Sequence, residues 1–475
     1  MDNSQFHHFG TIPDKERADD TIAAVATPFG RGGIGIIRLS GQRAKEIAEK
    51  IFRPVNASSN LISHRLYLGN IIDPSSGNMI DEVLLSYMKA PRSYTREDVI
   101  EINSHSGHIL LSRIMQIIMK EGARLAGPGE FTFRAFLNGR IDLTQAEAIV
   151  DLINSGSEKG IELATRQIKG SLKEEIEILR QRAIDLIAHS EVAIDFPEEE
   201  DGILCREDTA SRIEAELIGP IEKIIAAHSR RKIWIDGINS VIAGRVNVGK
   251  SSLLNRLLNE QRAIVTPIPG TTRDIIESLI NIEGIPVRLI DTAGIRKIRS
   301  EVEKIGIDLA EKKLAEADLS LIVMDQSRPI HKDDIDIINR SKNSLQIIII
   351  NKIDLPPVLR ENELIRLANG SPVVKISALT GEGMDKLNES IKDRVMQSDP
   401  EAVSPSFIPN LRHKRALSES LKHFQKAAYN SRNNSPQEII SIDLNSGLEI
   451  LGEITGTTSN EDIYVKIFRD FCIGK

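Results

Sequence analysis

The segment Gly244-Arg-Val-Asn-Val-Gly-Lys-Ser251 has the residue types and spacing of a phosphate-binding loop. In such a loop, backbone N–H groups surround phosphate oxygens while the lysine reaches the terminal phosphates. Residues 240–243 are expected to form a short buried strand before the loop, and residues 252–258 a helix after it. The phosphates would then lie at a helix N-terminus, where unpaired N–H groups and the helix dipole favour anions.

Three further segments follow in order: Thr-Pro-Ile-Pro-Gly-Thr-Thr-Arg-Asp at 266–274, Asp-Thr-Ala-Gly at 291–294 and Asn-Lys-Ile-Asp at 351–354. The carboxylate of Asp354 is suited to accept hydrogen bonds from N1–H and the exocyclic amine of guanine. Adenine lacks that edge, so a site built for those donors rejects it. Together, the motifs predict a GTPase.

The other members of the site follow from the same motifs. The hydroxyls of Ser251 and Thr272 are the candidate Mg²⁺ ligands, and Asp291 would bind that ion through water. Asn351 and Lys352 would support the base. The predicted GTP site consists of Asn247, Val248, Gly249, Lys250, Ser251, Ser252, Thr266, Pro267, Ile268, Pro269, Gly270, Thr271, Thr272, Asp291, Thr292, Ala293, Gly294, Asn351, Lys352, Asp354, Ser377 and Ala378.

Ile295 follows Gly294 where Ras-like enzymes have a glutamine that orients the attacking water. An aliphatic side chain cannot polarise water. Either an external activator is needed, or other groups of this chain do the work. Glu301 and Glu303 lie just downstream, and Asn247 offers an extra carbonyl ligand for a monovalent cation.

Composition sets outer bounds on the function. The chain has 475 residues, a net charge of -7 and two cysteines, Cys205 and Cys472. This charge does not indicate a nucleic-acid binder, so RNA contacts would use local basic patches such as 230–232 or 412–415, or a partner protein. The cysteines form no disulfide framework and suggest a reducing compartment. No apolar run approaches the ~18 residues of a membrane span.

We predict a multidomain α/β protein in five segments. An acidic, disordered leader (1–20) on a cytoplasmic protein precedes a small α+β domain (21–140), and a helical domain (141–236) follows. A Ras-like, doubly wound GTPase domain (237–396) is inserted before the second helical part (397–475). Its strands are expected at 240–243, 287–290, 319–324, 346–350 and 373–376.

Three local signals refine this organisation. Gly30-Arg-Gly-Gly-Ile-Gly35 matches the dinucleotide fingerprint, but residues 36–39 favour a strand where that fingerprint requires a helix. A turn between two strands is the better interpretation. Thr144-Gln-Ala-Glu147 indicates a capping box at the start of the first helix. An apolar stripe at helical spacing predicts bundle core: Ile168, Leu172, Ile176, Leu179, Ala183 and Leu186.

The chain resembles the MnmE (TrmE) family of tRNA-modification GTPases over everything beyond the first twenty residues. The resemblance rests on the phosphate loop, on segment 266–274 and on the final Phe-Cys-Ile-Gly-Lys of residues 471–475. It extends to 26–28, 128–131, 135–138, 193–197 and 301–306. One departure is Val246, where the family usually has proline.

The resemblance implies a K⁺ ion held by Asn247, Thr266, Ile268 and Thr271 when two GTPase domains dimerise, in the role of an arginine finger. It implies that Glu303 orients the attacking water. It also implies folate binding by Arg38, Glu101, Arg140 and Lys475, with 5-formyl- or methylene-tetrahydrofolate as the cofactor. The family often has lysine at the Arg140 position, and either cation can pair with an anionic folate.

The same resemblance implies a homodimer that forms a heterotetramer with the FAD-binding protein MnmG (GidA). Together they would add an aminomethyl-type group, carboxymethylaminomethyl, to carbon 5 of the wobble uridine of certain tRNAs. Cys472 is a candidate catalytic thiol; the alternatives are a buried bystander or a lipidation site. The alternative function is a GTP-switched ribosome-assembly or RNA-binding factor without covalent chemistry.

Overall fold

The structure is a computed structural model that describes residues 20–28, 30, 32–56, 60–195, 206–260, 277–291, 316–397, 407–458, 464, 467, 468, 471 and 474. The predicted leader lies outside these residues except for Asp20, whose carboxylate is ion-paired with Arg124 and Arg134. The chain divides into two compact units. The first comprises the described residues of Met1–Val150, Lys173–Asp185 and Asn445–Lys475, and the second those of Asp151–Leu172 and Leu186–Leu444.

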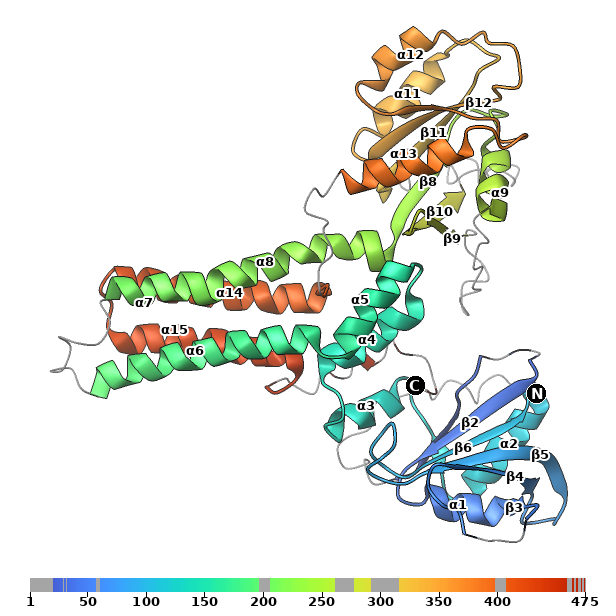
Figure 1. The fold of residues 1–475 in the computed structure, drawn as a ribbon, viewed down its shortest axis with the longest axis vertical. Coiled ribbons are helices and arrows are strands. Elements are labelled where there is room, and N and C mark those ends of the chain that lie inside the picture. Colours follow the sequence, from blue (N-terminus) through green and yellow to red (C-terminus); the bar gives the residue numbers. More distant parts are fainter. Residues whose placement is uncertain are drawn as a thin grey trace, which may run out of the picture. The chain divides into compact units, whose positions relative to one another are not determined.

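A mixed sheet with the strand order β3-β4-β5-β6-β2-β1-β7 forms the centre of the first unit (Figure 1). Its strands are β1 (Ile22–Val25), β2 (Ile34–Ser40), β3 (Phe52–Pro54), β4 (Arg65–Ile72), β5 (Met79–Met88), β6 (Val99–His105) and β7 (Arg124–Leu125). The apolar sides of α1 (Ala44–Ile51) and α2 (His108–Lys120) share one core with the inward residues of this sheet. A third helix, α3 (Glu130–Leu137), follows β7.

The glycine-rich segment at 30–35 leads into a strand. β2 begins at Ile34 and pairs antiparallel with β1, which confirms the interpretation of a connection between two strands. β2 also pairs antiparallel with β6, and this register places Arg38 directly opposite Glu101. Residues on paired strands that face each other have side chains close enough to interact.

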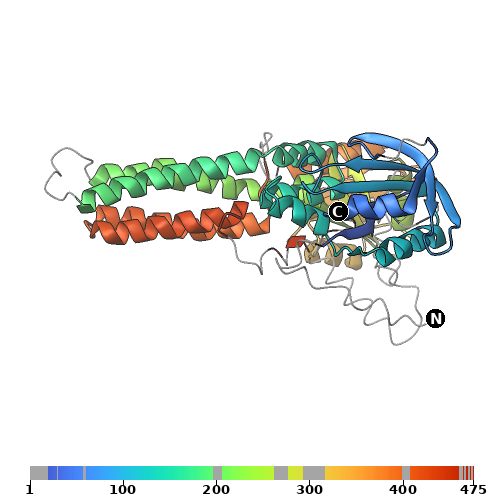
Figure 2. The same cartoon turned by 90° about the horizontal axis from the view of Figure 1, so that it is seen from below.

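The helical elements are α4 (Leu143–Asn154), α5 (Glu158–Ile168), α6 (Ser171–Asp195), α7 (Arg206–Ile213), the π-helical η4 (Glu214–Ile218), α8 (Gly219–Ala227), the 3₁₀ turn η5 (His228–Arg230), the π-helical η6 (Lys232–Asp236), α14 (Leu411–Arg432) and α15 (Gln437–Thr455). Helices α7 and α8 lie along α14 in both views (Figures 1 and 2). The sheet of the second unit therefore interrupts a helical bundle in the sequence. Of the predicted stripe, all members from Leu172 to Leu186 are buried, while Ile168 is half-buried.

The predicted capping box at Thr144 is wrong by two residues. Helix α4 begins at Leu143, and the carboxylate of Asp142 accepts hydrogen bonds from Gln145 N at 3.0 Å and Thr144 Oγ1 at 2.6 Å. The Gln145 side chain returns a bond to Asp142 N at 3.0 Å. Aspartate is at least as good an N-cap as threonine, so both Asp142–Gln145 and Thr144–Glu147 fit the capping-box pattern. The box that forms is Asp142–Gln145.

The second unit contains a six-stranded sheet with the order β13-β12-β11-β8-β10-β9. Its strands are β8 (Ile238–Ala243), β9 (Glu277–Ile282), β10 (Ile285–Asp291), β11 (Leu319–Asp325), β12 (Leu345–Asn351) and β13 (Val373–Lys375). The five predicted strands are confirmed within one or two residues at most ends. The antiparallel edge strand β9 was not predicted.

Helices cover both faces of this sheet, as a doubly wound fold requires. On one face, α9 (Lys250–Glu260) and α13 (Met384–Met396) share a core with alternate residues of the strands. On the other face, α11 (Lys332–Arg340) and α12 (Glu361–Ala368) pack on the remaining strand residues. Within the described part of the chain, no helix is long and apolar enough to cross a membrane.

The cap at Asp142 provides a stability test of this architecture. Asp142→Ala removes the acceptor for Gln145 N, and the free energy of unfolding should fall by about 1 kcal/mol. Glu174→Ala, an exposed acidic change in the first turn of α6, is the control and should stay within about 0.5 kcal/mol. Denaturant unfolding followed by circular dichroism measures both. Equal midpoints for the two variants would contradict the capping role.

Candidate functional site

The phosphate loop connects β8 to α9 at the carboxyl edge of the sheet. Gly244 has a φ of +149°, and a Cβ there would come within 2.3 Å of the Val323 carbonyl oxygen on the neighbouring strand. Only glycine fits this close approach of two backbones. Asn247, in the middle of the loop, also has a left-handed backbone with a φ of 65°. Gly244 and Asn247 therefore give the loop backbone its particular path.

The side chain of Lys250 lies back over the loop. Its Nζ donates hydrogen bonds to the carbonyl oxygens of Gly244 at 2.9 Å and Arg245 at 2.6 Å. The lysine of a phosphate-binding loop contacts the terminal phosphates of the nucleotide. The ammonium group of Lys250, held within the loop, is in the right place for that contact. Ser251 and Ser252, in the first turn of α9, are both exposed. Their hydroxyls are open to a ligand or an ion.

Asn351 connects the phosphate loop to the loop that follows β13. Its Nδ2 donates to the Val248 carbonyl oxygen at 2.8 Å, and its Oδ1 accepts from Ala378 N at 3.0 Å. The residue is 2% exposed. A buried amide that uses both its donor and its acceptor fixes the two loops relative to each other.

Asp354 is exposed, and its orientation is set by Ser377. The Ser377 hydroxyl donates to Asp354 Oδ1 at 2.5 Å and accepts from Thr380 N at 3.2 Å. No hydrogen bond to the described residues uses Asp354 Oδ2. One oxygen thus orients the carboxylate of this exposed residue, which suits an acceptor for the donor edge of guanine.

Lys352 extends from the base-side motif to the phosphate loop. Its Nζ lies 2.6 Å from Asp325 Oδ2 and donates to the Asn247 carbonyl oxygen at 2.8 Å. Burial alone would raise the pKa of Asp325, but hydrogen bonds from Lys352 and Ser327 outweigh it and the pKa lies below its usual value. Asp325 is thus a carboxylate that the site keeps ionised.

The structure brings together one part of the predicted GTP site and leaves another undescribed. Residues 247–252, 351, 352, 354, 377 and 378 all lie at the carboxyl ends of β8, β12 and β13. Asp291 ends β10 and pairs with Ile242 of β8, although its side chain is not described. The predicted Thr266, Pro267, Ile268, Pro269, Gly270, Thr271, Thr272, Thr292, Ala293, Gly294 and Glu303 fall outside the described residues.

Two acidic residues that support the loop were missed at the sequence level. One is Asp325, and the other is Asp334, whose Oδ1 lies 3.0 Å from Nε of Arg245. Asp334 is buried in the first turn of α11 and also accepts from His331 N. For Asp325 a signal existed, since an acidic residue at the end of an apolar strand lies at the carboxyl edge where this fold binds ligands.

A second cluster, in the first unit, brings together Arg38, Glu101 and Arg140, three of the four residues predicted to bind folate. Arg38 Nε donates to Glu101 Oε1 at 2.8 Å, and the Arg38 guanidinium lies 5.7 Å from the Phe131 ring centroid. Tyr94 has two cations near its ring, with Arg38 at 5.9 Å and Arg140 at 4.9 Å from the ring centroid. Planar guanidiniums beside aromatic faces suit a flat ligand that carries negative charge.

The end of the chain reaches this cluster. Arg38 also donates to the Gly474 carbonyl oxygen at 3.2 Å. Phe468 packs on Phe133 with ring centroids 5.1 Å apart, and Phe471 lies 5.2 Å from Phe468. The predicted residues Cys472 and Lys475 lie outside the described residues, although their described neighbour Gly474 touches Arg38.

Tyr94 is held by the helix that carries Phe131. Its hydroxyl lies 2.9 Å from Thr132 Oγ1. Burial is the main cause that raises the pKa of Tyr94, and the hydrogen bond with Thr132 opposes it in part. The phenol therefore stays neutral near pH 7 and presents an uncharged aromatic face to the two arginines.

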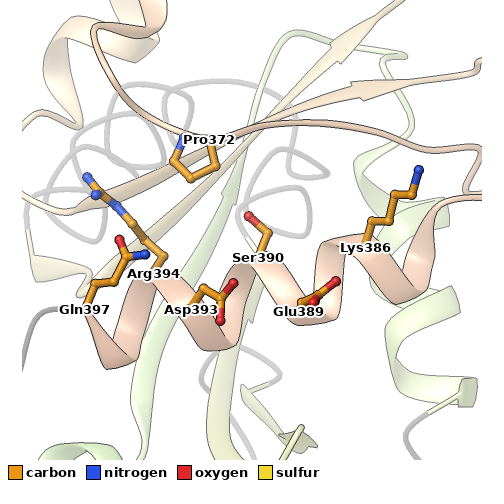
Figure 3. Close-up of a pocket in the computed structure, with 7 residues that line it drawn as sticks. All are labelled: Pro372, Lys386, Glu389, Ser390, Asp393, Arg394 and Gln397. Atoms are coloured by element: carbon orange, nitrogen blue, oxygen red, sulfur yellow. The ribbon is translucent and has the colours of Figure 1, made fainter. Parts of the chain in front are cut away.

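A separate cavity of about 270 Å³ lies on α13 and is lined by Pro372, Lys386, Glu389, Ser390, Asp393, Arg394 and Gln397. Figure 3 shows Pro372 facing the row of side chains from this helix. Pro372 precedes β13, so this cavity is at the amino edge of the sheet, opposite the phosphate loop. Its mixed charges do not favour one class of ligand.

Parallel strands that carry a phosphate loop and an oriented carboxylate for guanine define the class of protein, a P-loop GTPase. Two family models match the chain: the MnmE helical domain over residues 143–472 and the GTP-binding protein TrmE N-terminus over residues 21–140. The tRNA modification GTPase MnmE of Acetivibrio thermocellus is 44% identical over 461 residues, which cover 96% of this chain and 99% of the relative. The chain belongs to the tRNA modification GTPase MnmE (TrmE) family.

A second relative agrees with this assignment, and two solved structures are similar to only part of the chain. The tRNA modification GTPase MnmE of Geobacillus thermodenitrificans is 43% identical over 462 residues, which cover 96% of this chain and 99% of the relative. The G domain of the FeoB iron transporter of T. maritima is 29% identical with a TM-score of 0.25, covering 33% of this chain and 98% of that one. A variant of Era from Aquifex aeolicus, bound to GDP·AlF4⁻, is 29% identical with a TM-score of 0.27, covering 39% and 66%. The assignment rests on the family models and the relatives.

Gly249→Ala tests the geometry of the phosphate loop. A Cβ at Gly249 would lie 2.2 Å from Nδ2 of Asn351, and this amide cannot move without breaking its bonds to both loops. We expect nucleotide affinity to fall by at least about tenfold, the cost of a lost buried hydrogen bond or more. Equilibrium titration with a fluorescent GDP analogue measures it.

The matched control is Gly370→Ala. Gly370 has a similar φ of +85°, but nothing lies within 4 Å of a Cβ there. Backbone strain alone should cost this variant about 1–2 kcal/mol of stability without changing nucleotide affinity. If both variants bind nucleotide like the parent, the loop does not depend on the Asn351 contact.

Proposed function

We propose that this chain is a K⁺-activated GTPase that works with the FAD-binding protein MnmG on tRNA. Together they install a carboxymethylaminomethyl group at carbon 5 of the wobble uridine, using a one-carbon unit from a tetrahydrofolate. The observation that carries the proposal is the pair of sites in one chain: the loops joined by Asn351 and the arginine–tyrosine cluster at Arg38. The relatives' name, tRNA modification GTPase, supports the tRNA substrate.

At the nucleotide site, the loop N–H groups and Lys250 bind the phosphates while Asp354 selects guanine. Mg²⁺ would be held by Ser251 and Thr272, with Asp291 acting through water. The exposed Ser251 and the oxygen-donor chemistry of both hydroxyls fit this hard cation. Glu303 would orient the attacking water, a task that Ile295 cannot perform.

Asn247, Thr266, Ile268 and Thr271 would hold K⁺. Asn247 fits this role because it is exposed within the phosphate loop and its backbone is anchored by Lys352. When bound, the ion supplies positive charge beside the β- and γ-phosphates, as an arginine finger does in other GTPases. The residues of this chain set the position of that charge.

The first unit would bind 5-formyl- or methylene-tetrahydrofolate. The residues that would hold this cofactor are Arg38, Glu101, Arg140 and Lys475. Glu101 orients Arg38, and Tyr94 offers an aromatic face near two guanidiniums, which fits a planar anionic cofactor. Cys472 would lie next to this site as the catalytic thiol, because its neighbour Gly474 touches Arg38. A ribosome-assembly factor without covalent chemistry would leave this cluster without a ligand.

The proposed assembly is a homodimer that binds MnmG as a heterotetramer in the cytoplasm. Dimerisation of two GTPase domains would complete the K⁺ site, and MnmG would supply the flavin. Cycles of GTP hydrolysis would then drive the modification reaction. The folate half of the chain would provide the carbon.

The cation dependence of hydrolysis tests the GTPase proposal. GTP turnover should be at least about tenfold faster in K⁺ than in Na⁺ at equal ionic strength, since the charge acts where an arginine finger would. Asn247→Ala should remove most of this difference by deleting a ligand. Asn369→Ala, which changes an exposed asparagine with a φ of 46° elsewhere in the same unit, should retain it. Equal turnover in both salts would leave an external activator as the better account.

Reduced-folate binding tests the second site. Arg38→Ala should lower the affinity for 5-formyltetrahydrofolate, measured by calorimetry, by at least about tenfold, because a charged hydrogen-bond donor is lost. GTP turnover should persist. Arg43→Ala, an exposed arginine paired with Glu46, is the control and should bind folate normally. The Arg38 variant should also fail to restore modified wobble uridine in cells. Normal folate binding by this variant would place the cofactor elsewhere.

A further inference from the structure

Asp325 is the acidic end of β11, and its side chain is 1% exposed. Its Oδ2 lies 2.6 Å from Lys352 Nζ, while its Oδ1 accepts from Ser327 N at 2.9 Å and Ser327 Oγ at 2.6 Å. Every oxygen of this buried carboxylate therefore has a partner. A second cation, Arg328, lies farther from the same oxygen, with its Nε 3.7 Å from Oδ2. A buried charge with such satisfied bonds strongly resists separation from its cationic partners.

Lys352 passes this constraint to the phosphate loop. The same Nζ donates to the Asn247 carbonyl oxygen at 2.8 Å. Lys352 and Asn247 have φ values of 64° and 65°, so two non-glycine residues with left-handed backbones meet at one hydrogen bond. Such conformations persist only when surrounding contacts hold them, and they gather at functional sites.

We propose that Asp325 is a positioning residue for the nucleotide site: through Lys352 it fixes the backbone of Asn247, and so couples the guanine-binding motif to the phosphate loop. The inference rests on the proposed GTPase function and adds a residue to it. The proposal gives Asp325 no direct contact with nucleotide or ion. One ion pair, formed by the buried Asp325 and the half-buried Lys352, would thus set both the base-side lysine and the loop that carries the candidate K⁺ ligand.

A purely structural role for Asp325 would act through the Ser327 turn instead. Asp325→Asn separates the two roles, because the amide oxygen can still accept from Ser327 while the charge facing Lys352 is lost. If the amide does not support folding, Asp325→Glu retains the charge but displaces it by one methylene. Asp333→Asn is the matched control, since Asp333 is an exposed acid in the first turn of the nearby helix α11.

The test is a double-mutant cycle on the full-length chain with a fluorescent GDP analogue as the probe. Asp325→Asn and Lys352→Met should each speed GDP release by about tenfold, the typical effect of losing a charge-assisted hydrogen bond. If Asp325 acts through Lys352, the double variant should release GDP no faster than Lys352→Met alone. Asp333→Asn should match the parent.

Two results would overturn the proposal. The first is parental GDP release by Asp325→Asn. The second is multiplication of the two effects in the double variant, which would mean that Asp325 and Lys352 act independently. A second readout is the K⁺ concentration for half-maximal GTP turnover, which should rise in Asp325→Asn and not in Asp333→Asn. If GTP turnover by the parent chain does not depend on K⁺, the cation proposal is refuted. The GDP-release cycle would still decide the role of Asp325.

Discussion

The nucleotide site depends on the amide of Asn351, which hydrogen-bonds to Val248 of the phosphate loop and to Ala378 of the base-side loop. The three segments are distant in sequence and meet only because β8, β11, β12 and β13 run parallel and end at one edge. An unpaired buried amide costs about 1–3 kcal/mol, so neither loop can move away cheaply. Asn351 therefore turns two loops into one surface.

Two ion pairs also stabilise that surface. Their acidic residues come from one strand and from the helix that follows it. Asp325 at the end of β11 holds Lys352, and Asp334 at the start of α11 holds Arg245 of the phosphate loop. Both carboxylates are buried, where breaking a pair is far more costly than for exposed ions. The glycines of the phosphate loop allow its backbone many conformations, and these two ion pairs restrict it to one. The result is a loop arranged before any ligand arrives.

The sequence predicted those elements whose signal is local. Apolar runs located β8, β10, β11, β12 and β13, and the apolar stripe at helical spacing located α6. Strand β9 was missed because it is an antiparallel edge strand that alternates buried and half-buried residues, with Asn281 among them. The motifs located Asn351, Lys352 and Asp354, yet no motif includes Asp325, whose partner lies 27 residues away. Long-range ion pairs leave no spacing pattern in one sequence.

The described aromatic residues near the end of the chain pack against the rest of the first unit. Phe468 and Phe471 pack with Phe133 of α3, and Arg134 on the same helix is buried in ion pairs with Asp20, Glu97 and Glu130. These pairs fix α3, which also carries Phe131 against Arg38. Gly474 has a φ of +94°, and a Cβ there would come within 2.7 Å of the Val25 carbonyl oxygen. The tail can therefore approach β1 only with glycine at this position, and that approach is what lets its carbonyl reach Arg38.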